Sequence, residues 1–119
     1  MEERRNYRDL TVWQRAIDLV PKVYQFLKQF PKEETYALAD QIRRAVVSIP
    51  ANIAEGQGRQ SKKEFLQYLA IAKGSLAELD TLLIVAQRLN YLSESDFLTL
   101  EKALAEVRRP LVGLVKSLR

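Results

Sequence analysis

Basic residues gather in one stretch of this sequence. Between Gln41 and Lys63 there are five basic residues and one acid, Glu55, so the stretch alone carries the +4 net charge of the 119-residue chain. The five are Arg43, Arg44, Arg59, Lys62 and Lys63. Because Lys and Arg neutralise the phosphates of nucleic acids, these residues are candidate contacts to RNA or DNA.

The same cations have a second interpretation as surface ion pairs. Residues four apart face each other on a helix, so Asp40 is placed to pair with Arg44, and Glu55 with Arg59. Pairing is the favoured interpretation for Arg44, and both interpretations stay open for Arg59 and the two lysines. A further group of acids is expected to interrupt any continuous positive surface: Glu33, Glu34, Asp40, Glu94 and Asp96.

A polar stripe runs along the same segment. At 100° per residue, one side of a helix would carry Gln41, Arg44, Ser48, Asn52 and Glu55. As a catalytic site this stripe offers one carboxylate and a serine with no histidine to activate it. A buried polar network of Gln41, Ser48, Asn52 and Glu55, which fixes the register between helices or subunits, is favoured instead.

Histidine and cysteine are both absent from the sequence. Their absence excludes disulfide frameworks, zinc fingers, thiol catalysis and histidine acid–base chemistry. It also excludes the Glu-x-x-His pairs with which helical bundles hold di-iron centres. We therefore predict that the protein is not an enzyme and needs neither a cofactor nor a metal ion.

Four helices are expected to position these residues, at about 11–30, 34–57, 62–90 and 95–118, because apolar residues recur there in steps of three and four. Thr11 with Gln14 and Ser61 with Glu64 predict capping boxes, and Ser93 or Ser95 predicts an N-cap. Short connections require antiparallel neighbours, so the fold class is all-α: an up-down-up-down four-helix bundle formed by a single domain, residues 1–119.

Three prolines fall inside these helical patterns, Pro21, Pro50 and Pro110. A proline removes one backbone hydrogen bond from a helix, so bent helices are expected. A break at Pro21 that divides the first helix is the alternative.

Some apolar residues of the second and third helices lie away from the face that packs in the bundle. On the second helix these are Val47, Ala51 and Ala54, and on the third they include Ile71, Gly74 and Leu82. A helix that is apolar on two faces needs a second partner. We predict a homo-oligomer built across these two helices, in which Gly74 permits close approach of backbones.

The string QIRRAVVSIPANIAEGQGRQSKKEFLQYLAIAKGSLAELD, residues 41–80, resembles the four-helix-bundle proteins encoded in intervening sequences of 23S ribosomal RNA, also called the S23 ribosomal protein family. The resemblance extends through DLTVWQRAIDLVPKVY, FPKEETYALADQI and AQRLNYL to nearly the whole chain. It implies a small cytoplasmic bacterial bundle with no known catalytic activity and a ring-like homopentamer. The family is also similar to the accessory protein of diversity-generating retroelements, a basic pentameric barrel that binds nucleic acid and a reverse transcriptase.

Two functional hypotheses follow. The first is an oligomeric basic scaffold that holds RNA or DNA through phosphate contacts. The second is a structural module whose partner is another protein and whose charges keep it soluble. The charged N-terminus and the lack of a long apolar run predict a cytoplasmic protein with no membrane partner.

Overall fold

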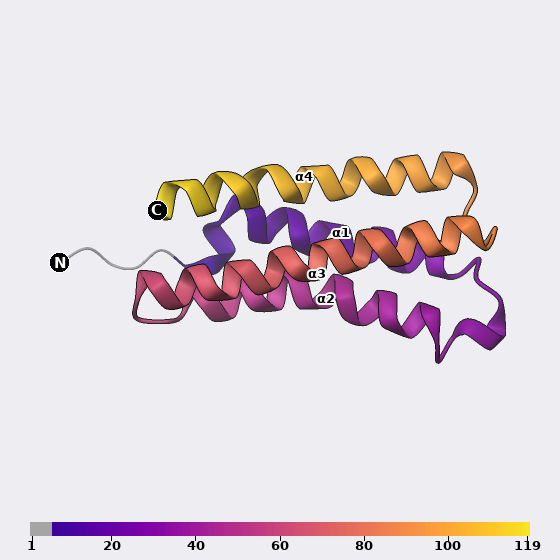
Figure 1. Cartoon of the computed structure of the whole chain (residues 1–119), viewed down its shortest axis with the longest axis horizontal. Coiled ribbons are helices and arrows are strands. Elements are labelled where there is room, and N and C mark those ends of the chain that lie inside the picture. The colour runs from indigo at the N-terminus through magenta and orange to yellow at the C-terminus, as the bar shows by residue number, and fades with distance from the viewer. Residues whose placement is uncertain (1–5) are drawn as a thin grey trace.

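The computed structural model describes residues 6–119 as an elongated bundle measuring 53 × 25 × 19 Å (Figure 1). Its elements are the 3-10 turn η1 (Tyr7–Asp9), helix α1 (Thr11–Leu27), the 3-10 turn η2 (Lys32–Glu34), and helices α2 (Leu38–Gln57), α3 (Lys62–Arg88) and α4 (Glu94–Leu118). No strand occurs in these residues. The predicted all-α four-helix bundle is confirmed.

Each helix packs against two neighbours. Successive helices run antiparallel, and α4 closes the bundle by packing against α1 as well as α3 (Figure 1). The apolar stripes predicted from the sequence meet along the axis, where the largest fully buried side chains are Leu19, Val23, Ile42, Val46, Ile49, Ile53, Leu69, Leu79, Leu83, Leu100, Leu104 and Leu111. Burial of this branched aliphatic core is the main source of stability.

Three helix ends differ from the sequence-based boundaries. Helix α1 ends at Leu27 instead of residue 30, and α2 begins at Leu38 instead of residue 34. Pro31 and the turn η2 occupy the interval, because proline disfavours helical backbone in the residue before it. Helix α3 ends at Arg88 instead of about residue 90, since Asn90 takes a left-handed conformation with φ of 64°. The Tyr91 N–H then bonds the Ala86 carbonyl, as in a Schellman cap.

Two of the three predicted N-caps are confirmed. The hydroxyl of Ser61 accepts from the Glu64 N–H at 3.1 Å, and that of Ser93 accepts from the Asp96 N–H at 3.0 Å. The capping box at Thr11 is wrong. Thr11 is already the first helical residue, Leu10 occupies the N-cap without a side-chain bond, and the Gln14 amide donates instead to the Arg8 carbonyl.

All three prolines lie inside helices, and α1 continues unbroken through Pro21. Pro110 has no N–H for the carbonyl of Glu106, four residues earlier. Arg15 of α1 reaches this carbonyl at 3.4 Å and forms an ion pair with the Glu106 carboxylate at 2.8 Å. The proline thus exposes an acceptor that ties α4 to α1.

The two helices that pack over the greatest length are α2 and α3, and Gly56 allows their close approach near the turn that joins them. A Cβ added to Gly56 would lie 2.5 Å from the Cβ of Tyr68 and 3.1 Å from the ring of Phe65. No real Cβ tolerates the first of these distances, so Gly56 is required by packing.

Gly56→Ala is therefore expected to lower the free energy of unfolding by about 1–3 kcal/mol, because α2 and α3 must separate to admit the methyl group. Gly113→Ala is the matched control. Beyond its own turn of helix, no atom lies within 4 Å of the position that a Cβ would take there, so the helix propensity of alanine should raise stability by up to about 1 kcal/mol. Urea denaturation of both variants tests this, and equal effects of the two substitutions would contradict it.

Candidate nucleic-acid interface

The five cations predicted to bind phosphate occupy two different places. Arg59, Lys62 and Lys63 surround the α2–α3 turn, at the end of the bundle where α4 also finishes (Figure 1). Arg43 and Arg44 lie about 20 Å away, near the start of α2. The structure therefore brings three of the five together and leaves two near the opposite end.

Arg43 and Arg44 are engaged by their own neighbourhood. The Arg44 Nε lies 3.2 Å from an Asp40 carboxylate oxygen, and Arg43 donates to the Thr35 carbonyl at 2.6 Å. Arg43 also lies 3.9 Å from Asp40. The ion pair favoured for Arg44 from the sequence is confirmed, and both guanidinium groups serve to hold the start of α2.

Arg59 stabilises the turn that carries the lysines. Its guanidinium donates to the Glu55 carboxylate at 2.9 Å and to the Tyr68 hydroxyl at 2.6 Å. Tyr68 first, and Glu55 second, raise the pKa of Arg59. Lys62 and Lys63 are exposed in the first turn of α3, and in the described part of the chain neither forms an ion pair. Among the five predicted cations, these two lysines are the ones left accessible to an external phosphate.

Asp40 interrupts the positive charge of Arg43 and Arg44, as expected, but the five acids expected to break up the positive surface all lie away from Arg59, Lys62 and Lys63. Because the helices alternate in direction, the connection that precedes α2 and the one between α3 and α4 share the far end of the bundle (Figure 1). Glu33, Glu34, Asp40, Glu94 and Asp96 all belong to that end. The Tyr91 hydroxyl there donates to Glu34 at 2.7 Å, a bond that raises the pKa of Tyr91.

Sequence reasoning missed a second group of cations, in the final part of α4. Arg108, Arg109, Lys116 and Arg119 follow the last acid of the chain, Glu106. Lys116 and Arg119 reach the end occupied by the α2–α3 turn (Figure 1). A charge count over one continuous segment cannot detect this grouping, whereas counting charge by bundle end, from the predicted antiparallel topology, would have found it.

The predicted polar stripe forms a network only at its centre. The hydroxyl of Ser48 lies 2.6 Å from that of Ser75 on α3, and the Asn52 amide donates to the Ser48 hydroxyl at 3.0 Å and to its carbonyl at 2.8 Å. Gln41 is exposed, and Glu55 belongs to the turn with Arg59. Ser75, a polar residue within the buried stripe of α3, is the partner that the sequence analysis missed.

The residues predicted to form a subunit interface lie mainly on the outer surface of α2 and α3. Val47 is 44% exposed and Ile71 is 50% exposed, and Ala51 and Gly74 are exposed beside them. Ala54 and Leu82 are half-buried. Val85 and Leu89 extend the apolar surface along α3, at 39% and 48% exposure. The single chain therefore leaves this face without an apolar partner.

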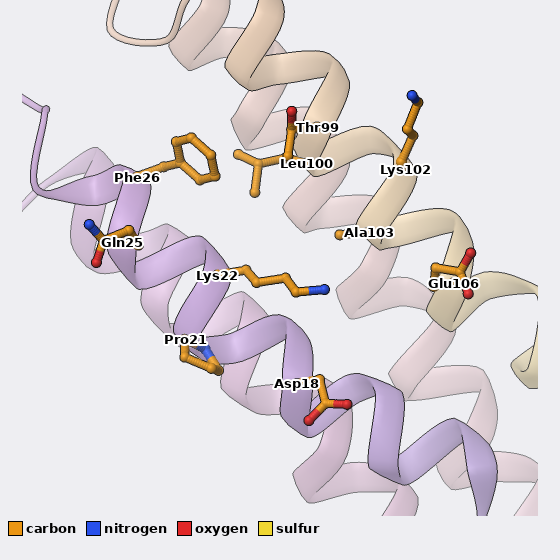
Figure 2. A pocket seen from close by; sticks show the side chains of 10 residues that line it. All are labelled: Asp18, Pro21, Lys22, Gln25, Phe26, Thr99, Leu100, Lys102, Ala103 and Glu106. Atoms are coloured by element: carbon orange, nitrogen blue, oxygen red, sulfur yellow. The ribbon is translucent and has the colours of Figure 1, made fainter.

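A groove of about 770 Å³ lies between α1 and α4 (Figure 2). Phe26 and Leu100 point toward one another, and the Lys22 side chain extends from α1 toward α4. The Thr99 hydroxyl, which also lines the groove, donates to the Ser95 carbonyl at 3.1 Å. This bond engages the hydroxyl proton within its own helix, so the groove presents no activated nucleophile.

Two carboxyl groups meet where α3 packs on α4. Glu101 lies beside Asp80, whose Oδ1 atom is buried with no hydrogen-bond partner among the described residues. Burial is the main cause that raises the pKa of Glu101, followed by the hydrogen bond and the negative charge of Asp80, while Arg108 opposes the shift. Burial and the neighbouring carboxylate both favour the protonated form of Glu101. Within residues 6–119, no three acidic side chains gather to hold a metal ion.

The fold and its charges define the class of protein first: a small four-helix-bundle protein with an excess of positive charge at one end. The family model for the 23S rRNA-intervening sequence protein matches residues 8–113, and the chain belongs to this family. A search of curated proteins finds no match. Neither the family nor the geometry points to catalysis.

One solved structure supports the fold. It is the crystal structure of a protein of unknown function from the S23 ribosomal protein family of Bacteroides thetaiotaomicron VPI-5482. The two chains superpose with a TM-score of 0.81 at 24% identity, over 88% of this chain and 95% of the other. In the described part of this chain, no helix combines the length and apolar character needed to cross a membrane.

The Asp80–Glu101 pair predicts a pH dependence of stability. Because folding raises the pKa of Glu101 above its ordinary value of 4.5, the folded state binds the proton more tightly. The stabilisation is complete below that value and is lost as the pH rises through the folded-state pKa. Glutamine has the shape of a protonated glutamate and carries no charge. Glu101→Gln should therefore be more stable than the original protein near pH ~7, with the difference shrinking toward pH ~4. Thermal melts across this pH range measure the difference in stability. A difference that does not change with pH would contradict a raised pKa of Glu101.

Proposed function

We propose that this protein is a non-enzymatic oligomeric scaffold that holds RNA or DNA through phosphate contacts at the end formed by the α2–α3 turn. The observation that carries the proposal is the separation of charge along the bundle. Lys62 and Lys63 stand without an ion pair at the end where Lys116 and Arg119 also lie, whereas at the other end the acids of the connecting segments are balanced by an equal number of basic residues. A polyanion would approach such a molecule in one orientation.

The local structure of the turn suits a phosphate. Lys62 and Lys63 occupy the first turn of α3, where backbone N–H groups and the helix dipole favour negative charge. Ser61 caps only part of this terminus. Arg59 fixes the path of the turn through Tyr68 and Glu55, so the lysines project from a defined backbone. Contacts of this kind position a nucleic acid without reading its sequence.

Oligomerisation would strengthen such binding. The exposed apolar face of α2 and α3 supports a proposed homo-oligomer, and the resemblance to ring-forming relatives suggests a pentamer. In a ring with cyclic symmetry all subunits point the same way along the axis. Every cationic end would then lie on one rim, and several weak phosphate contacts would act together.

A protein-binding module without a nucleic-acid role is the second candidate function. The observation in its favour is that Arg43, Arg44 and Arg59 are already engaged by acids or carbonyls of their own chain. Ionic strength separates the two candidates, because phosphate binding releases counterions and weakens steeply with salt.

Charge reversal tests the nucleic-acid contacts. Lys62→Glu with Lys63→Glu should weaken binding of single-stranded RNA by about tenfold or more and reduce the slope of log affinity against log salt. Lys28→Glu with Lys32→Glu is the control, because it makes the same charge change with exposed lysines at the end opposite to the α2–α3 turn. Fluorescence anisotropy at several salt concentrations provides the measurement. Equal losses from the two double variants would argue for a net-charge effect and against this site.

The interface is tested by placing a charge on each of two equally exposed residues. Ile71 on α3 is 50% exposed and Leu98 on α4 is 52% exposed. Ile71→Glu should dissociate the assembly, because it puts a charge into the proposed apolar contact, and Leu98→Glu should leave the mass unchanged. Light scattering at micromolar concentration measures both. A monomeric original protein, or an assembly indifferent to Ile71→Glu, would refute this interface.

A further inference from the structure

A second groove, of about 300 Å³, lies between the first half of α3 and the last part of α4. It belongs to neither the α2–α3 turn nor the exposed apolar face. Its volume is at the lower limit of the pockets in which proteins hold small organic molecules. The groove is therefore large enough for one small, unbranched molecule.

The floor of this groove is entirely aliphatic. It consists of Leu66, Leu69, Ala70, Leu111, Val112 and Val115. Leu69 and Leu111 are fully buried at its base, and the small side chain of Ala70 leaves the space open. No aromatic ring lines the groove, so it offers no stacking surface for a nucleobase. An alkyl chain is the chemical group that such a floor accommodates best.

Every charged residue that lines this groove is a cation. The three are Lys73, Lys116 and Arg119, and none has an ion pair in the described part of the chain. Lys116 lies in the last turn of α4 and Arg119 directly follows the helix, and both line the same groove. One anionic group can contact both of them while its apolar chain lies on the floor.

The groove between α1 and α4 provides a contrast within the same molecule. It is larger, yet Asp18 and Glu106 balance Lys22 and Lys102 along its sides (Figure 2). A ligand there meets no excess of positive charge. The two grooves therefore differ in the feature that matters for an anionic ligand: only the α3–α4 groove has an excess of positive charge around it.

We propose that the α3–α4 groove binds a medium-chain carboxylate, with the alkyl chain against Leu69 and Leu111 and the carboxylate between Lys116 and Arg119. The volume matches a single alkyl chain, so the proposed ligand is a free carboxylate rather than a two-chain lipid. This proposal does not depend on the proposed nucleic-acid function, and its test contains no nucleic acid.

Isothermal titration of the full chain with decanoate, below the concentration at which it forms micelles, is the primary test. Octanoate should bind about tenfold more weakly, because each buried methylene contributes about fourfold and the groove is open on one side. Decyltrimethylammonium carries the same chain with the opposite charge and should not bind measurably. Absence of decanoate binding, or equal binding of the cationic probe, would overturn the proposal.

Substitutions then locate the binding. Ala70→Leu fills the groove at an exposed helical position and should abolish decanoate binding, whereas Ala103→Leu, which fills the α1–α4 groove, should not change it. Lys116→Gln with Arg119→Gln should weaken binding at least tenfold and provides a second test that leaves the floor intact. Equal affinity of the Ala70→Leu and Ala103→Leu variants would show binding outside this groove and overturn the proposal.

Discussion

The close approach of α2 and α3 is the constraint on which the other features of this protein depend. Gly56 has no Cβ, so Tyr68 can pack directly against the α2 backbone. Tyr68 in turn accepts a bond from Arg59, which fixes the turn that presents Lys62 and Lys63. Further along the same seam, the hydroxyl groups of Ser48 and Ser75 lie 2.6 Å apart and link the two helices. The cationic end and the exposed apolar face both belong to this helix pair.

The antiparallel topology gives the bundle an uneven distribution of charge along its length, although the overall composition is only weakly basic. The net charge is only +4, which by itself is weak support for nucleic-acid binding. Antiparallel helices place alternate connections at opposite ends, so the acids Glu33, Glu34, Asp40, Glu94 and Asp96 lie at the end of the bundle opposite to Lys62, Lys63, Lys116 and Arg119. The same arrangement brings Asp80 beside Glu101 across two helices.

The fold could be predicted from the sequence because apolar periodicity and caps such as Ser61 and Ser93 are local signals. The short turn at Lys32–Glu34 was missed because its backbone depends on Pro31 and on packing with the other loop, through Phe30 and Tyr91. At the candidate site, the ion pairs of Arg44 and Arg59 followed from i,i+4 spacing. The contact of Ser48 with Ser75 and the two grooves could not be predicted in this way, because each requires side chains from two helices.

The central claim is that the cationic end of the bundle holds nucleic acid through phosphates. The most direct measurement is the ratio of absorbance at the nucleic-acid and protein maxima after purification in low salt and again in high salt. The account predicts that the low-salt protein carries nucleic acid and that high salt removes it, because counterions compete for the lysines. Protein that is free of nucleic acid at low salt, and that takes up none when RNA is added, would contradict the account.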